Sequence, residues 1–239
     1  LNVSGGEVRA GYIKFLSSKN NSTYRQTGGL VTLGGPNTEQ GYFDLASNGK
    51  TARLDLDGGV LEAWKLYGGA NAEFRADGGT LRAGKRIRNG NVSMFNPFMY
   101  DFGSAKLGAK GLRFDTAGVD VNVTQGFANK DGVEGLFEKV GGGTLTLESA
   151  AHTVSKTVVS GGTLKYANAS GSFATTLVIT NGAVFSMAGE EVAVLTLNGL
   201  KVDNGRIELD PGDVITVTGA VDLKDLSLSF TSAPAEAQN

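Results

Sequence analysis

The chain of 239 residues contains no cysteine and only 4 prolines. Without cysteine there is no disulfide, no zinc–thiolate site and no thiol nucleophile. The shortage of proline excludes a collagen-like triple helix, which needs a strict Gly-X-Y repeat and abundant proline. Long hydrophobic runs are also missing, because no stretch reaches the roughly 18 apolar residues of a transmembrane helix. We therefore predict that this segment does not span a membrane.

A strong excess of either charge is absent as well. The formal net charge is −2 and the isoelectric point is near 5.5. No basic face is indicated, so nucleic acid is not predicted as a partner. The chain begins at Leu1 and shows no signal-peptide pattern, which we interpret as a processed fragment of a longer protein.

Glycine, in contrast, is abundant, with 36 residues, about twice the average usage. Much of it lies in one recurring phrase, a glycine pair followed by a strand of alternating apolar and polar residues. Its clearest copies are at residues 4–10 (SGGEVRA), 57–63 (DGGVLEA), 77–83 (DGGTLRA), 141–147 (GGGTLTL) and 160–166 (SGGTLKY). Alternate side chains of a strand point to opposite sides. The glycines supply turns with positive φ, which other residues adopt only at a cost.

The copies recur at a nearly constant spacing. It is 20 residues from Gly58 to Gly78, 19 from Gly142 to Gly161 and 21 from Gly161 to Gly182. Such a period marks a solenoid, in which each repeat buries its apolar face only by stacking on its neighbours. An all-strand unit of this length predicts an all-β, single-stranded parallel β-helix. Roughly ten coils at about 4.8 Å each would form a rod on the order of 50 Å long.

We expect one β-helix over residues 1–230, with less regular N-terminal coils at 1–50 and a flexible tail or linker at 231–239. Residues 91–106 are predicted to be an aromatic loop excursion, because Pro97 cannot donate to a strand ladder. Residues 188–194 are the best helical candidate, although we favour a turn there. The predicted interior is an aliphatic ladder that includes Leu54, Leu56, Leu81, Leu145, Leu147, Leu164, Leu195, Leu197, Ile207 and Leu209.

Chemically active residues are few. The one histidine, His152, is interpreted as a loop residue, because no nucleophile-elbow pattern accompanies it. Asp55 and Asp57 share one side of a strand, the arrangement that glycoside or calcium chemistry would use, but a solvated outer face explains them more simply. The basic run at residues 85–88 is interpreted in the same way. No catalytic, metal-binding or cofactor-binding residue is assigned.

Aromatic residues are the candidates for contact with a ligand or partner. Trp64 and Tyr67 lie near a turn and can stack on a sugar ring. Phe95, Phe98 and Tyr100 belong to the aromatic stretch, and an exposed apolar patch marks interaction sites. For both groups the alternative is packing against the solenoid. The predicted partners are a glycan or a host or matrix surface, together with end-to-end self-association through open strand edges.

Three blocks between residues 74 and 166 resemble the autotransporter-associated β-strand repeat, also called the passenger-associated transport repeat. They are residues 74–84 (FRADGGTLRAG), 111–123 (GLRFDTAGVDVNV) and 135–166 (GLFEKVGGGTLTLESAAHTVSKTVVSGGTLKY). The last block is the most specific, with a lysine-plus-glycine turn before a TLTL strand. It departs from the family at residues 149–155, where the usual glycine and tyrosine are missing. The resemblance implies a right-handed β-helical passenger segment, and this handedness agrees with the rule for parallel crossovers.

The resemblance also implies a place outside the cell, either secreted or anchored at the outer membrane of a bacterium. The leading functional hypothesis is therefore a surface-exposed or secreted stalk or adhesin segment that is structural or adhesive and not catalytic. One alternative is a β-helical polysaccharide lyase or hydrolase, which would need a concave groove with converging Asp, Lys or Arg side chains. Another is a subunit of a self-assembling fibre.

Overall fold

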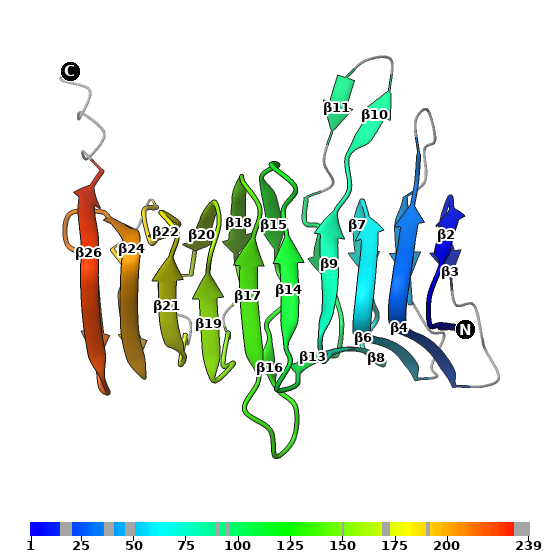
Figure 1. Cartoon of the computed structure of the whole chain (residues 1–239), viewed down its shortest axis with the longest axis horizontal. Coiled ribbons are helices and arrows are strands. Elements are labelled where there is room, and N and C mark those ends of the chain that lie inside the picture. Colours follow the sequence, from blue (N-terminus) through cyan, green and yellow to red (C-terminus); the bar gives the residue numbers. More distant parts are fainter. Residues whose placement is uncertain are drawn as a thin grey trace.

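The computed structural model describes residues 1–14, 21–35, 41–45, 51–88, 91–93, 96–149, 151–168, 173–189 and 192–231, without the side chains of 86–88 and 91–93. Within these ranges the protein is all-β, contains no helix and winds into a parallel β-solenoid of about nine turns. The rod runs from the N-terminus at one end to β26 at the other (Figure 1). The predicted β-helix is confirmed.

Each coil places strands on up to three faces of the rod. The first face holds β1 (Asn2–Val3), the beginnings of β4 (Ser22–Leu33) and β6 (Ala52–Ala63), β8 (Ala72–Ala76), β13 (Ser104–Leu107), β16 (Ala128–Asn129), β23 (Val194–Leu197) and β25 (Val214–Val217). The second face holds β2 (Glu7–Ala10), the ends of β4 and β6, β9 (Gly79–Ala83), β14 (Leu112–Asp115), β17 (Leu136–Val140), β19 (Lys156–Val159), β21 (Thr176–Thr180), and the beginnings of β24 (Gly199–Leu209) and β26 (Val221–Phe230). The third face holds β3 (Ile13–Lys14), β5 (Tyr42–Asp44), β7 (Lys65–Tyr67), β12 (Met99–Tyr100), β15 (Val121–Val123), β18 (Thr144–Leu147), β20 (Thr163–Tyr166), β22 (Val184–Ser186), and the ends of β24 and β26.

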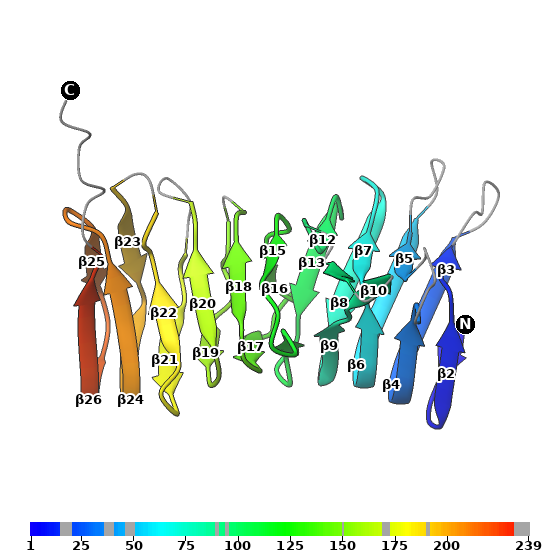
Figure 2. The ribbon, with the colours of Figure 1, turned by 90° about the horizontal axis from the view of Figure 1, so that it is seen from above.

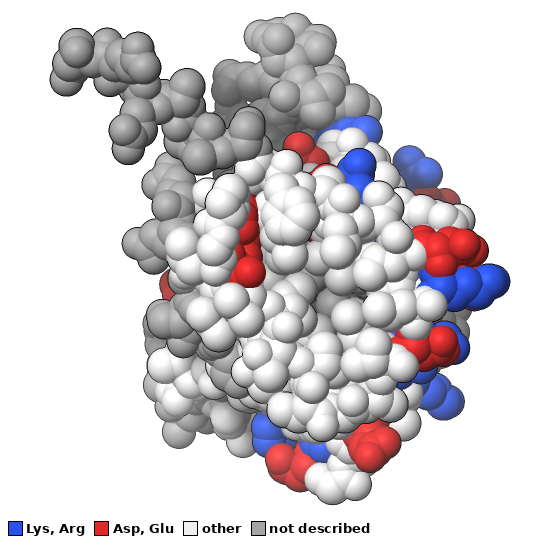
Figure 3. Space-filling view, turned by 90° about the vertical axis from the view of Figure 1, so that its left-hand side faces the viewer, with Lys and Arg blue, Asp and Glu red and all other residues white. Residues whose placement is uncertain are grey.

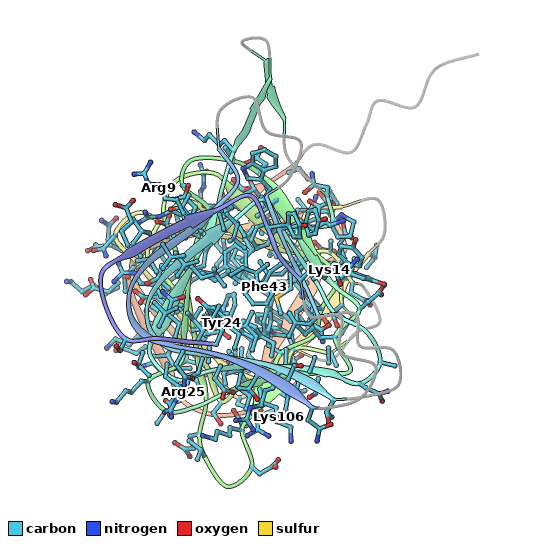
Figure 4. All side chains as sticks on the ribbon, turned by 90° about the vertical axis from the view of Figure 1, so that its right-hand side faces the viewer. Arg9, Lys14, Tyr24, Arg25, Phe43 and Lys106 are labelled. Atoms are coloured by element: carbon cyan, nitrogen blue, oxygen red, sulfur yellow. The ribbon has the colours of Figure 1, made fainter. Side chains whose placement is uncertain are left out.

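The winding is right-handed. Figure 4 looks along the rod from its N-terminal end, where the chain passes Arg9 at the upper left, then Lys14 at the right, then Arg25 at the lower left. This path is clockwise, and the later coils lie farther from the viewer. Clockwise motion away from the viewer is a right-handed screw, the hand that parallel crossovers favour.

The core consists of inward side chains stacked from coil to coil. Val31, Leu61 and Leu81 are successive ladder partners on the second face, and Phe43 partners Leu66 on the third. All five are fully buried. The predicted aliphatic interior is confirmed, with these residues buried: Leu54, Leu56, Leu81, Leu145, Leu147, Leu164, Leu195, Leu197 and Ile207. Leu209 is partly buried against the same core.

The glycine pairs stack on one another at the corner between the first and second faces. Gly29 and Gly59 both have φ near +70°, at 73° and 72°. A Cβ on Gly29 would lie 2.6 Å from the carbonyl oxygen of Gly6, one coil earlier. A Cβ on Gly59 would lie 2.7 Å from the carbonyl oxygen of Gly28. The repeated pair is therefore required twice over, by the backbone conformation and by the approach of one coil to the next.

The excursion predicted at residues 91–106 begins before residue 91 and ends before residue 106. The antiparallel hairpin of β10 (Arg86–Arg88) and β11 (Asn91–Ser93) leaves the coil and projects from the side of the rod (Figure 1), so that β10 is seen over the coils in Figure 2. After the hairpin, Phe98 and Met99 are fully buried and Phe102 is nearly so. The aromatic stretch thus returns to the core within a few residues. Phe95 and residues 232–239 lie outside the described residues.

Candidate functional site

Two of the aromatic candidates for ligand contact are buried. Trp64 is only 3% exposed, and its ring fills the space over two glycines of the preceding coil. A Cβ on Gly34 would stand 2.6 Å from the Trp64 ring, and a Cβ on Gly41 would overlap it. Phe98 is fully buried, edge-on to Phe114 with ring centroids 5.5 Å apart. Both residues therefore pack within the solenoid, as the alternative interpretation of the sequence predicts.

The structure does bring Tyr67 and Tyr100 together. They are ladder partners on the third face, both partly exposed, with ring centroids 5.0 Å apart. The ammonium of Lys65 lies 5.4 Å from the centroid of Tyr100 and 5.9 Å from that of Tyr67, within the range of a cation–π contact. Of the five predicted contact residues, this pair presents a continuous aromatic surface.

A second surface lies on the first face and joins several coils. We call it the charged groove, a hollow of about 230 Å³. Its lining residues are Arg25, Arg53, Asp55, Asp57, Arg75, Ala76, Asp77 and Lys130. The sequence pattern placed Asp55 and Asp57 on one side of a strand, and Arg53, two residues before Asp55 in the same strand, shares that side. The pattern did not indicate that Arg25, Arg75 and Lys130, from other coils, would complete the set.

Opposite charges alternate in this groove both along and across the strands. Within β6, Arg53 contacts Asp55, with Nη2 to Oδ2 at 2.9 Å. Within β8 the order is reversed, and Glu73 contacts Arg75 with Oε2 to Nη2 at 2.7 Å. The ladder then pairs Arg53 with Glu73 and Asp55 with Arg75. Each charge therefore has an opposite charge beside it in two directions, which holds four side chains over neighbouring coils.

Arg75 is held firmly in its charged form. The hydrogen bond that Arg75 donates to Glu73, together with the negative charges of Glu73 and Asp55, raises the pKa of the guanidinium against the opposing effect of burial. Arg25 adds a third pair, with Nε 3.0 Å from Oδ2 of Asp57. The groove is thus a fixed array of charges. It meets one requirement of the enzyme alternative, converging Asp, Arg and Lys side chains in a concave surface.

His152 is a core residue, which corrects the expectation of a loop histidine. Its backbone is irregular, but its side chain is 1% exposed and stacks on Phe173 with ring centroids 4.8 Å apart. Nε2 lies 3.0 Å from the hydroxyl of Thr157, which in turn lies 3.0 Å from the hydroxyl of Thr175. Burial lowers the pKa of the imidazole to about 3, so the ring is neutral at physiological pH.

Lys139 is the second unexpected core residue, fully buried at the corner between the second and third faces. Its Nζ donates to the carbonyl oxygens of Val140, Gly141 and Gly161, each at 2.9 Å. The last of these belongs to the next coil, so the ammonium ties two glycine turns together. Burial lowers its pKa to about 8, against the opposing charges of nearby aspartates. The lysine-plus-glycine turn noted in the sequence forms this corner of the coil.

The C-terminal end of the rod is apolar. In the last coil Val221, Leu223, Leu228 and Phe230 are each about half exposed or more, with Phe230 at 67%. Figure 3 views this end, and its described surface carries few charged side chains, whereas blue and red atoms alternate along one edge. Among the described strands, β26 pairs only with β24, so its other edge is the one that end-to-end self-association would use, and that association stays a prediction.

Within the described ranges, no group of three or more His, Cys, Asp or Glu side chains is placed to hold a metal ion. The same part of the chain has no helix long and apolar enough to cross a membrane. No protein-family model, no curated protein and no solved structure matches the chain.

Proposed function

We propose that this chain is a β-helical passenger segment of the autotransporter type, exposed on a bacterial surface or secreted, which acts as a stalk or adhesive scaffold and not as a catalyst. The observation that carries the proposal is the continuity of the stack. On the second face one inward column passes by ladder pairing from Val8 to Leu223 without a break. Such a column converts added repeats directly into added length.

Charges on the outside support the same role, because many of them connect coils. Arg82 lies between Glu62 of the preceding coil, at 3.7 Å, and Asp115 of the following coil, at 2.9 Å. Lys224 reaches back to Asp203 at 3.0 Å. Exposed pairs contribute little stability, because water and salt screen them. Their value here is alignment, since they favour one register between neighbouring coils.

The resemblance noted in the sequence supports the placement outside the cell. Its most specific block forms β17, β18, β19 and β20. Within this block Lys139 donates a hydrogen bond to Gly161, in the turn between β19 and β20. The blocks of the resemblance thus coincide with the stacked strands of the rod.

Surface exposure can be tested on intact cells of the source organism. An antibody against the folded chain should label unbroken cells or the culture medium, and external protease should remove the cell-bound label. A cytoplasmic protein serves as the control for lysis. Label that appears only after the cells are opened would overturn the proposal.

A polysaccharide-active enzyme is the second candidate, and the charged groove favours it. Its test is the release of new reducing ends, or of unsaturated products, from a panel of plant and bacterial polysaccharides. Activity that Asp55→Asn abolishes without loss of folding would replace the scaffold proposal.

The fibre alternative is tested by light scattering over a range of protein concentrations, with Leu223→Lys and Phe230→Lys as variants that should abolish any growth in size.

A further inference from the structure

The C-terminal end of the rod is built like its interior. Within the described part of the chain, β26 pairs with β24 alone. Its inward side chains are largely exposed, with Leu223 at 49%, Leu228 at 55% and Phe230 at 67%. The ladder partners of the first two in the preceding coil are buried, Val202 at 1% and Ile207 at 2%. The last coil thus presents to its free side the kind of apolar surface that every earlier coil covers.

The backbone of this coil also offers free hydrogen-bonding groups along its edge. The amide of Leu200 in β24 donates to the carbonyl oxygen of Ala220 at 2.9 Å, so Ala220 faces β24. Successive residues of a strand direct their N–H and C=O groups to opposite edges. Val221 and Leu223 therefore direct theirs to the free edge. An edge of this kind is a template for pairing with another strand.

Two charged side chains flank Leu223, which we call the apolar centre of the edge. Asp222 pairs with Lys201 of the preceding coil at 2.8 Å, and Lys224 pairs with Asp203 at 3.0 Å. The side chains of Asp222 and Lys224 nevertheless stay 64% and 68% exposed. The edge therefore carries a negative charge before its apolar centre and a positive charge after it, and a strand that docks there must match both.

The N-terminal coil of a second copy does not match these charges. The inward column that ends at the apolar centre begins at Val8, so head-to-tail stacking that continues this column sets β2 in a fixed register against β26. Glu7 then lies beside Asp222, and Arg9 lies beside Lys224. Like charges directly opposite each other on paired strands are destabilising. Head-to-tail growth in this register is therefore disfavoured.

A second copy turned end for end does match. When β26 pairs antiparallel with β26 of another copy, centred on Leu223, residue 222 of each copy lies opposite residue 224 of the other. Asp222 then meets Lys224 twice, once on each side of a two-fold axis. Leu223 lies opposite itself, and because its N–H and C=O groups face the free edge, the two copies can exchange a pair of hydrogen bonds there.

We propose that the C-terminal end of the rod is a dimerisation surface for a second copy of this chain, joined tail to tail through antiparallel β26 strands. A two-fold axis normal to the second face exchanges the first and third faces. It sets the exposed Leu228 and Phe230 of each copy over β25 of the other, where Ile215 and Val217 pack against the core. Such a contact is isologous and closed, so a third copy cannot join at the same place.

The test is analytical ultracentrifugation of the purified chain over a range of concentrations, which should show a monomer–dimer equilibrium and no larger species. Asp222→Lys makes both charges of the edge positive, and Lys224→Asp makes both negative. Each variant alone should dimerise at least tenfold more weakly, because like charges then face each other across the two-fold axis. An equimolar mixture of the two variants should dimerise like the unmodified chain, since every facing pair is again opposite in sign.

The mixture separates the contact between copies from effects within one copy. Each variant loses an ion pair to its own preceding coil, with Lys201 or Asp203, and this loss persists after mixing. Recovery of the dimer therefore comes from the interface alone. Glu7→Lys is the matched control, because it reverses the same charge at the other end of the rod and should leave the dimer unchanged.

A single introduced thiol gives an independent readout, because the chain contains no cysteine. The two Leu223 residues of the proposed dimer form a hydrogen-bonded antiparallel pair, whose Cα atoms lie about 5.5 Å apart, within the range of a disulfide. Leu223→Cys, treated with diamide, should therefore yield covalently linked dimers. Val8→Cys should not.

The proposal fails if the chain stays monomeric at millimolar concentration, if the mixed variants stay monomeric, or if particles grow without limit. Association that Glu7→Lys strengthens would show a head-to-tail contact in place of the tail-to-tail one. The pairing uses neither the tyrosine pair nor the charged groove. Antibody labelling of intact cells and polysaccharide turnover are therefore unaffected by its outcome, and the proposed function is judged separately.

Discussion

Gly29 lies over the Gly6 turn so closely that a Cβ on Gly29 would stand 2.6 Å from the Gly6 carbonyl oxygen. Gly6 has the same conformation, with φ of 72° against 73° for Gly29, but nothing lies within 4 Å of its own Cβ position. The two glycines share one motif and one conformation, and they differ in whether a preceding coil occupies the place where a Cβ would stand.

This difference predicts unequal costs for the same substitution. Gly6→Ala should lower the free energy of unfolding by about 1 kcal/mol, the cost of a left-handed conformation. Gly29→Ala should lower it by about 3 kcal/mol or more, because the methyl group also forces two coils apart. Gly132, with φ of 72° and open space around it, is a control in mid-chain. Urea unfolding measures all three, and equal losses at Gly6 and Gly29 would contradict the stacking explanation.

His152 predicts a loss of stability in mild acid. Its folded-state pKa is lowered from the model-compound value of 6.5 to about 3, so between these values the unfolded chain binds a proton that the folded chain does not. Stability is therefore complete above about pH 6.5 and falls as the pH drops. The linkage relation gives a loss of about 2 kcal/mol between pH 7 and pH 5.

The measurement compares unfolding of the unmodified chain and of His152→Phe at both pH values. The variant should lack this part of the acid loss, since phenylalanine fits the aromatic cluster without titrating. Because the chain has 1 histidine, its NMR signal is unambiguous and should stay that of a neutral ring at pH 5. A normal titration near pH 6.5 would refute the buried position.

Lys139 predicts a gain in stability at alkaline pH. Its pKa is lowered from 10.5 to about 8, so between these values the unfolded chain again holds the extra proton. Stability contributed through this group should rise from about pH 8 to about pH 10.5, by up to about 3 kcal/mol. Lys139→Met removes that rise, and at pH 7 it should cost about 2 kcal/mol because three turn carbonyls lose their donor. Parallel pH slopes for the two chains would show that the amine is not buried.

The solenoid predicts that a whole coil can be removed. Thr144 is the ladder partner of Thr163, so deleting residues 144–162 brings Thr163 into the place of Thr144. The shortened chain should fold cooperatively with a rod about 4.8 Å shorter, as small-angle scattering can measure. Deleting only residues 144–153 puts every later strand out of register and should prevent folding. Two shortened chains of equal stability would argue against coil-by-coil stacking.

Much of the fold can be predicted from the sequence alone. The glycine pairs at a spacing near 20 residues, together with the alternation in phrases such as DGGTLRA, predict coils and the inward side of each strand. Local rules suffice there, because strand alternation and turn chemistry depend on neighbours in the sequence. For the same reason Leu54, Leu56 and Leu81 were recognisable as core residues.

The tertiary structure decided everything that depends on which coil lies beside which. Lys139 carries a charge, yet it lies two residues after buried Phe137 on the inward side of β17, where the corner carbonyls of two coils enclose it. Trp64 lies near a turn, yet the glycines of the preceding coil make room for its ring. Asp55 and Arg75 are 20 residues apart in sequence and become neighbours only in the ladder. A repeat pattern in the sequence determines that the coils stack. Which side chains meet depends on the register between coils. The length of each intervening loop sets that register, and these lengths follow no periodic rule.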